Sequence, residues 1–306
     1  MTKPVLSLNF SDCPPQFENY FLPILEEKYT IRREERPEFL VYALTGHRHR
    51  LYNCVKIYVH HETYRPNWKE CDYAILPIDL QDPRVLHVPI FAFDRSPEPL
   101  IRRETNWEAV RAGKTRFCAL LSSYADLTVS RRVRFFQALN RRRKVDSAGR
   151  ALNNCGFTGI PGHDAKLEFY RPYRFVISFE NKERLGWTTE KMYDPLAAHS
   201  IPIFWGDRQA SHYFNPECFI NAHDFSCEED LAEYVLHVDD SPDLYLKYLR
   251  AAPFRDNRPP EEFSRQRILD FFDRIFTTPI KPVAQRRWFF PLTKWRLAKR
   301  NKLSTE

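Results

Sequence analysis

Short apolar segments alternate with longer stretches of helical periodicity, and this alternation limits the possible folds more than any other feature of the chain. In the first hundred residues the apolar segments are VLSLNF, EFLVYAL, KIYVHH and DYAILPI, while PPQFENYFLPILEEKY has apolar residues at helical spacing. Strands that alternate with helices predict parallel sheets covered by helices. We therefore expect an α/β fold.

A second set of such segments follows the proline-rich stretch PIFAFDRSPEPLIRRET. RFCALLSS, YRFVISFE and IPIFWGD have strand patterns, and SRRVRFFQALN, TTEKMYDPLAAHS and CEEDLAEYVLHVD have helical ones. Because 306 residues exceed what one hydrophobic core usually serves, two domains are expected. We predict Rossmann-like domains at residues 1–110 and 111–275 that face each other across a cleft, followed by a tail of residues 276–306.

The positive charge of the chain is concentrated near its C-terminal end. Residues 281–306 contain eight Lys or Arg residues and one Glu, which gives +7, the same as the net charge of the whole chain. Trp288, Leu292, Trp295 and Ala298 recur at helical spacing there, with bases on the other face, as in helices that lie on anionic membranes. The alternatives are a basic end that is solvated or packed against the body, and a nucleic-acid contact.

The cysteines and the N-terminal segment give information about the cellular compartment of the protein. The seven cysteines are odd in number and form no C-x-x-C pair, and MTKPVLSLNF is not a signal peptide. This pattern is typical of reduced thiols in a cytosolic protein. No apolar run approaches the ~20 residues that a membrane-spanning helix needs. We expect a cytoplasmic protein that lies peripherally on the inner face of the membrane.

Residues 178–191, SFENKERLGWTTEK, contain many ionic groups between a predicted strand and a predicted helix. The strand pattern places Asn181 at the carboxyl end of a strand, and Thr188 or Thr189 is a good helix N-cap. Glu190 and Lys191 then occupy the first helical turn. The free N–H groups of a helix start, together with a lysine, suit a phosphate group.

Two further side chains of this stretch extend the interpretation. A carboxylate beside a phosphate site, here Glu190, commonly accepts hydrogen bonds from sugar hydroxyls. Trp187 is expected to present a flat face over the same site. Together these features suit a nucleotide-sugar, although a charged surface loop with a capped helix would show the same local pattern.

The segment FENKERLGWTTEKMYDPLAAHSIPIFWGD resembles the α1,3-fucosyltransferase motif of glycosyltransferase family 10. That motif has F-E-N-S, then T-E-K six residues later, then a short helix and a P-V/I-x-x-G strand. FINAHDFSCEEDLAEYV, FCALLSS…RRVRFFQALN and HHETYRPNWKECDYAI resemble other segments of the family, so the resemblance covers about residues 55–255. It implies a GT-B fold with GDP-fucose bound by the C-terminal domain.

The resemblance also implies roles for individual residues. Trp187 stands where the family usually has tyrosine, and Lys182 replaces the usual serine. Arg131 is adjacent to the arginine that matches the family's diphosphate-binding position and is the alternative to it. The residues at donor-binding positions are Arg132, Asn181, Trp187, Glu190 and Lys191.

Transfer of a sugar to a hydroxyl also requires a base that accepts the proton of that hydroxyl, a role that suits a carboxylate. Glu62 ends the predicted strand KIYVHHE and lies ten residues before Asp72, which is the spacing of the family's proposed base. His60 and His61 are alternative bases. Without the resemblance, Glu62 would be interpreted as a polar turn residue.

These observations predict an inverting α1,3-fucosyltransferase that moves fucose from GDP-fucose to an N-acetylglucosamine-containing glycan, of the lipopolysaccharide or Lewis type. Alternatives are an α1,4 linkage, another GDP-sugar donor, or a non-catalytic protein that binds membranes or nucleic acid. No D-x-D motif and no His/Cys cluster at ligand spacing occurs, so we predict no required metal or cofactor, although a divalent cation could stimulate the reaction. The expected partners are GDP-fucose, an oligosaccharide acceptor and an anionic membrane surface.

Overall fold

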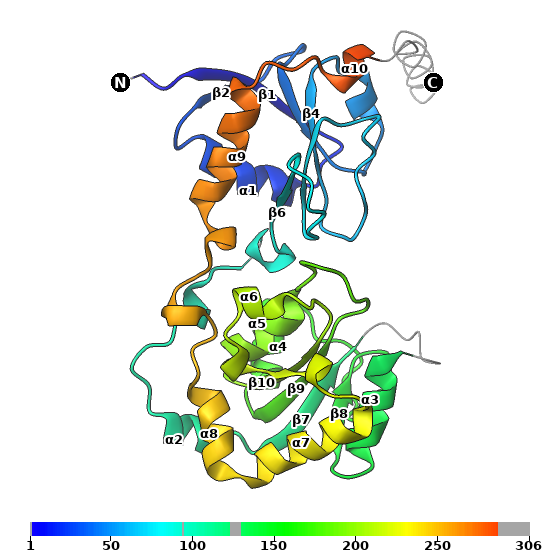
Figure 1. The fold of residues 1–306 in the computed structure, drawn as a ribbon, viewed down its shortest axis with the longest axis vertical. Coiled ribbons are helices and arrows are strands. Elements are labelled where there is room, and N and C mark those ends of the chain that lie inside the picture. The colour runs from blue at the N-terminus through cyan, green and yellow to red at the C-terminus, as the bar shows by residue number, and fades with distance from the viewer. Residues whose placement is uncertain (1, 94, 123–129, 287–306) are drawn as a thin grey trace. The chain divides into compact units, whose positions relative to one another are not determined.

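The computed structural model describes residues 2–93, 95–122 and 130–286, and it divides the chain into two α/β units (Figure 1). The first unit comprises Met1–Arg95 together with Glu261–Glu306, and the second comprises Ser96–Pro260. Each unit has its own parallel sheet with flanking helices. The expected pair of Rossmann-like domains, the GT-B class of fold, is therefore confirmed.

In the first unit, the described strands form one sheet in the order β2-β1-β3-β4-β5-β6, and every neighbouring pair is parallel. All five residues of β4 and all four of β5 are buried, as expected for parallel strands that have both faces covered. The strands are β1 Val5–Ser11, β2 Thr30–Arg32, β3 Phe39–Tyr42, β4 Val55–Val59, β5 Tyr73–Leu76 and β6 Val85–His87.

Two helices far apart in the sequence complete the core of the first unit. Helix α1 (Pro15–Leu25) packs against helix α9 (Arg265–Thr277), and the rings of Phe21 and Phe272 meet edge to face with centroids 5.6 Å apart. Helix α9 has its apolar residues at three- and four-residue spacing, so one face of the helix is buried. The chain thus returns to the first sheet after it has formed the second unit.

The expected domain limits at residues 110 and 275 are therefore wrong. Helix α9 was expected in the second domain, but its apolar face completes the first core. Residues 96–110 belong instead to the second unit, where Arg102 and Asn257 exchange two hydrogen bonds of 2.7 Å between backbone and side-chain amide. Helical periodicity identifies an apolar face, but it does not say which sheet that face covers.

In the second unit, the described strands form a parallel sheet in the order β11-β10-β9-β7-β8. The strands are β7 Arg116–Leu121, β8 Val145–Ala148, β9 Tyr173–Phe179, β10 Ile201–Trp205 and β11 Ile220–Asn221. The helices are α2 Trp107–Ala112, α3 Arg131–Asn140, α4 His163–Tyr170, α5 Glu190–Ala197, α6 Ala210–Tyr213, α7 Glu228–Asp240 and α8 Pro242–Arg250.

The two faces of the second sheet are covered by different helices. Leu120 and Ile177 point to one face and pack with α3, α7 and α8, whereas Ala119 and Val176 point to the other face and pack with residues of α4 and the end of α5. This division follows from the alternation of side chains along a strand. Helices α4 and α5 also contact each other, and they lie next to the site described below.

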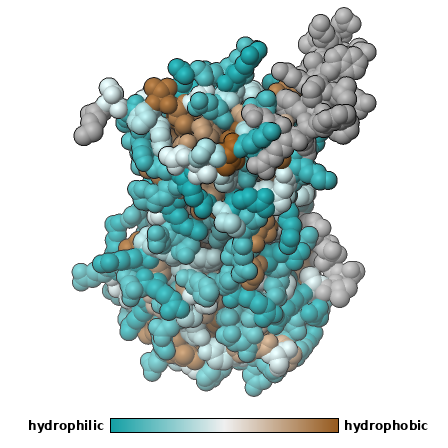
Figure 2. Space-filling model, turned by 45° about the horizontal axis from the view of Figure 1, so that its top comes forward, coloured by the Kyte–Doolittle hydropathy of each residue, from teal (hydrophilic) through white to brown (hydrophobic). Residues whose placement is uncertain are grey.

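The membrane contact was expected in the basic C-terminal tail alone. Figure 2 shows a hydrophilic surface over most of the visible face, with apolar residues in small separate patches. Among the described residues, no helix has both the length and the apolar character needed to cross a bilayer. Helix α10 (Val283–Arg286) ends the described chain, so Trp288, Leu292, Trp295 and Ala298 lie outside it.

We predict that Phe272→Ala destabilises the first unit by about 3–5 kcal/mol, because it removes a fully buried ring from the contact of α9 with α1. Gln266→Ala, at an exposed position of the same helix, is the control and should change stability by no more than about 0.5 kcal/mol. Hydrogen exchange should accelerate in β1 and β3 but not in β9 and β10. Faster exchange confined to β9 and β10 would show that α9 supports the second unit instead.

Candidate active site

The carboxyl ends of β7 and β9 and the start of α5 surround a cavity of about 210 Å³ in the second unit. Ligands of open parallel sheets bind at the carboxyl ends of the strands. Complete ligand pockets usually measure about 300–1,000 Å³, so this cavity suits part of a ligand. It is lined by Leu121, Ser122, Arg132, Ile160, Lys166, Tyr170, Asn181, Glu190, Lys191 and Asp194.

A larger hollow, of about 920 Å³, occurs in the first unit. It lies beside the amino ends of β1, β3 and β4, and its lining includes Val5, Phe39 and Phe276. Amino ends of parallel strands are not the usual position of a ligand site. We therefore place the candidate active site at the smaller cavity, where ionic side chains converge.

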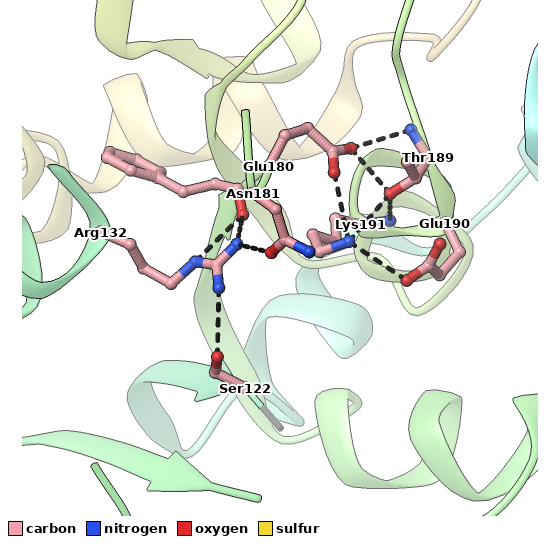
Figure 3. Close-up of polar contacts among 8 residues, drawn as sticks. Ser122, Arg132, Glu180, Asn181, Thr189, Glu190 and Lys191 are labelled. Carbon is pink, nitrogen blue, oxygen red and sulfur yellow. Dashed lines mark hydrogen bonds and ion pairs between the residues drawn. The ribbon is translucent and has the colours of Figure 1, made fainter. Parts of the chain in front are cut away.

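Helix α5 begins as the sequence predicts, with Thr189 as its N-cap (Figure 3). The Thr189 side-chain oxygen accepts a hydrogen bond from the backbone N–H of Lys191 at 3.3 Å. Gly186, with φ of 76°, turns the chain between β9 and this helix. The turn brings Glu190 and Lys191, at the start of the helix, to the cavity.

The carboxylate of Glu180, directly after β9, is fully buried behind the start of α5. Its Oε1 accepts hydrogen bonds from the backbone N–H and the hydroxyl of Thr189, at 2.9 and 2.7 Å, and its Oε2 pairs with Lys191 Nζ at 3.2 Å. Burial raises the pKa of Glu180, and the charge of Lys191 opposes that shift. Glu180 thus fixes both the cap and the lysine of the motif.

Gly206, directly after β10, is required beside this carboxylate. A Cβ atom at position 206 would lie 2.6 Å from Cγ of Glu180, so any larger residue would displace the buried side chain. Gly206, the glycine that ends the motif, therefore leaves room for the buried side chain of Glu180, the first acidic residue of the motif.

Lys191 lies between two acids. In addition to Glu180, its Nζ contacts Glu190 Oε1 at 3.4 Å and the hydroxyl of Thr189 at 3.2 Å. Burial lowers the pKa of Lys191, but the two carboxylates outweigh burial and the net shift is upward. Burial raises the pKa of Glu190, but Lys191 and Lys166 outweigh it and the net shift is downward. Both groups are therefore held in their charged forms.

Arg132, near the start of α3, holds the end of β9 from the other side (Figure 3). Its Nε donates to the backbone carbonyl of Phe179 at 3.2 Å, and its Nη2 donates to the same carbonyl and, at 2.8 Å, to Asn181 Oδ1. Its Nη1 donates to Ser122 Oγ at 3.1 Å. Arg131 instead donates to the carbonyl of Ala222, so Arg132 is the arginine of this pair that lines the cavity.

Trp187 does not present the open ring face that was expected. Its side chain is only 7% exposed, and it is not among the residues that line the cavity. Thr188 and Thr189 beside it are buried as well. A large apolar ring gains more from burial in the protein than from exposure to water, and the local pattern did not show which way this ring would turn.

Glu62 lies in the first unit, in the loop that follows β4, and its side chain is exposed. Its backbone N–H donates to His60 Nδ1 at 2.9 Å. Burial, and the neighbouring His61, lower the pKa of His60 to about 4, so this ring is neutral near pH 7. The ring of His61 stacks between those of Phe17 and His60, with centroid distances of 5.8 and 5.0 Å.

Several residues of the cavity were not predicted from the sequence. Asp194 lies four residues after Glu190, on the same face of α5, and helical spacing from the motif could have identified it. Asp194 Oδ1 pairs with His163 Nδ1 of α4 at 3.1 Å. Lys166 comes from α4, outside every segment that carries the resemblance, and Ser122 comes from FCALLSS at the end of β7, to which no role was assigned.

A resident metal would require a cluster of ligating side chains. In the part of the chain that the structure describes, no group of three or more His, Cys, Asp or Glu residues is arranged to hold a metal ion. Among the charged groups that line the cavity, Lys191 pairs with Glu190 and with the buried Glu180, whereas Arg132 donates to neutral oxygens of Phe179, Asn181 and Ser122.

Two protein-family models match the chain. Residues 111–264 match the C-terminal model of glycosyltransferase family 10 (fucosyltransferase), which is just over half of the chain. Residues 6–94 match the model of the α-(1,3)-fucosyltransferase FucT N-terminal domain. The two matches correspond closely to the two units of the structure.

Individual relatives agree with these models. The α-(1,3)-fucosyltransferase FucT of Helicobacter pylori is 28% identical over 85% of this chain and 62% of its own length. A human 4-galactosyl-N-acetylglucosaminide 3-α-L-fucosyltransferase is 31% identical over 44% of this chain and 36% of its own length. The chain thus spans less than two-thirds of these curated relatives.

A crystal structure of an α1,3-fucosyltransferase with GDP-fucose superposes with a TM-score of 0.73 at 23% identity, and covers 92% of this chain and 94% of the solved one. At this level of identity the likeness establishes the fold. The likeness supports a two-domain fold in which each domain contains one of the two parallel sheets.

We predict that Thr189→Ala destabilises the second unit by about 1–3 kcal/mol, because it removes the helix cap and leaves the buried Glu180 carboxylate short of a donor. Thr189→Ser keeps the hydroxyl and should lose less than half as much. Chemical denaturation of the three proteins measures the difference. Equal losses in the two variants would show that the methyl group matters and that the hydroxyl does not.

Proposed function

The chain belongs to glycosyltransferase family 10, and we propose that it transfers fucose from GDP-fucose to an N-acetylglucosamine-containing glycan, with inversion and an α1,3 linkage. The observation that carries this proposal is the convergence of Arg132, Asn181, Glu190 and Lys191 on one cavity at the start of α5. The resemblance assigns all four to the donor, and the start of α5 lies at the same cavity.

The donor's diphosphate is proposed to lie at the start of α5. A helix N-terminus with an adjacent cation binds phosphate oxygens, and it stabilises the charge that develops as a diphosphate leaves. Lys191 is held in position there by Glu180, and Arg132 by Phe179 and Asn181. Glu190, whose pKa is lowered, remains an acceptor for hydroxyl groups of the donor.

Glu62 is proposed as the base. As the acceptor oxygen bonds to the anomeric carbon of fucose, the bond from that carbon to the phosphate oxygen breaks, the hydroxyl proton moves to the Glu62 carboxylate, and the electron pair leaves with GDP. Attack on the face opposite to the leaving group inverts the anomeric centre. The exposed carboxylate of Glu62 is accessible to an acceptor.

His60 and His61 are weaker candidates for the base. The Nδ1 lone pair of His60 already accepts the N–H of Glu62, and a neutral imidazole then carries its proton on Nε2. The ring of His61 stacks on those of Phe17 and His60, and its Nδ1 atom is buried. His60 is better placed to fix the Glu62 backbone than to take a proton.

The remaining parts of the proposal concern metal and membrane. The protein's own cations, and not a resident metal, are proposed to take up the charge of the leaving GDP, while a divalent cation in solution could still screen released GDP. The basic part of the tail, residues 281–306, is proposed to hold the enzyme on the cytoplasmic face of an anionic membrane, where lipid-linked acceptors would be found.

We predict that the protein, given GDP-fucose and a panel of glycans, fucosylates acceptors that contain N-acetylglucosamine and forms α1,3-linked products. The linkage and the anomeric configuration of the products can be read by NMR. Transfer only from another GDP-sugar would change the proposed donor, and transfer only to other hydroxyl positions would change the proposed linkage. Absence of GDP binding and of transfer would contradict it.

We predict that Glu62→Gln lowers kcat by about 10²–10⁴-fold and leaves affinity for GDP-fucose close to the parent value, because the proton moves only in the transition state. Glu190→Gln is the contrasting variant, since its proposed hydrogen bonds exist in the ground state and its loss should weaken donor binding first. Turnover and donor affinity are measured for both. Parental turnover in Glu62→Gln would remove this residue from the base role.

A further inference from the structure

Three cations line the cavity at the start of α5, and two of them are occupied by the protein itself. Arg132 donates to Phe179, Asn181 and Ser122. Lys191 contacts two carboxylates and the hydroxyl of Thr189. A phosphate group that enters the cavity must compete with these acceptors for the same N–H groups.

Lys166 is the third cation, and its situation differs. Its side chain is half-buried and lines the cavity, yet its ammonium group makes no hydrogen bond or ion pair with any residue in the described ranges. It acts on Glu190 at longer range, because its charge is one of those that lower the pKa of that carboxylate. An ammonium group without a partner, on a half-buried side chain that lines an ionic cavity, is available to a ligand.

The position of Lys166 is set by helix α4. Lys166 and Tyr170 are four residues apart, so they share one face of α4, and both line the cavity. Tyr170 is buried, and His163 at the start of α4 pairs with the buried Asp194 of α5. These contacts fix the face of α4 that carries Lys166 against the helix that carries Lys191.

The charges at the cavity disfavour an anion unless Lys166 is counted. Its three cations face the carboxylates of Glu190 and Asp194, and the Glu180 carboxylate behind them contacts Lys191, so the charges balance with Lys166 and are negative without it. A diphosphate carries at least two negative charges. The compact ammonium of lysine, with three donors, is well suited to phosphate oxygens.

We propose that Lys166 donates hydrogen bonds to the diphosphate of the sugar nucleotide and takes up charge as the nucleoside diphosphate leaves. This inference rests on the proposed function and adds to it a donor-binding residue outside the motif. Lys166 can form these bonds without breaking an existing one, whereas Lys191 and Arg132 mainly hold the start of α5 and the end of β9 in place for the ligand.

The test is a comparison of GDP and guanosine binding by calorimetry. Lys166→Met should weaken GDP binding about 10- to 100-fold, the usual value of a charged hydrogen bond, and leave guanosine binding unchanged. Lys166→Arg should retain most of the affinity for GDP. Lys144→Met removes the same charge at an exposed position before β8 and should alter neither ligand.

Two results would overturn the inference: parental GDP affinity in folded Lys166→Met, or an equal loss for guanosine and GDP. If the Met variant does not fold, Lys166→Gln is measured in its place against the same criteria. A parent protein that does not bind GDP would contradict the proposed function itself. A parent that binds GDP, with an unaffected Lys166→Met, would contradict only the role of Lys166.

Discussion

The buried carboxylate of Glu180 is the interaction on which the site in the second unit depends. It joins the end of β9 to the start of α5 through the backbone and hydroxyl of Thr189, and it holds the ammonium of Lys191. A buried charge is tolerated only when it is paired and hydrogen-bonded, so these partners cannot move independently. Glu180 therefore orders the groups that meet the ligand without lining the cavity itself.

The parallel sheets explain why residues distant in sequence meet at this cavity. Ser122, at the end of β7, and Asn181, just after β9, lie at one edge because all strands of the sheet run in the same direction. Helices α4 and α5 cover the same face and bring Lys166 and Lys191 to that edge. In the first unit the same principle places the loop that carries Glu62 at the carboxyl end of β4.

Local features were predicted well from the sequence, and features that depend on tertiary packing were not. Strands such as β1, β4, β5, β7, β9 and β10 and the start of α5 at Glu190 follow from periodicity and capping, whereas β2, β6 and β8 were not predicted. Arg132 lies at the cavity, where the resemblance led us to expect it. The assignment of α9 to the first unit required knowledge of which sheet its apolar face completes. The burial of Trp187 and the contribution of Lys166 likewise depend on neighbours that no local pattern shows.

A crystal structure of the chain with GDP bound tests the central claim most directly, namely that the start of α5 is a diphosphate site. We expect the diphosphate at the start of α5, within hydrogen-bonding distance of the side chains of Lys191 and Lys166, with Glu180 still bonded to Thr189. GDP bound away from this helix start, with the Glu180–Lys191 pair and the cavity unchanged, would contradict the account.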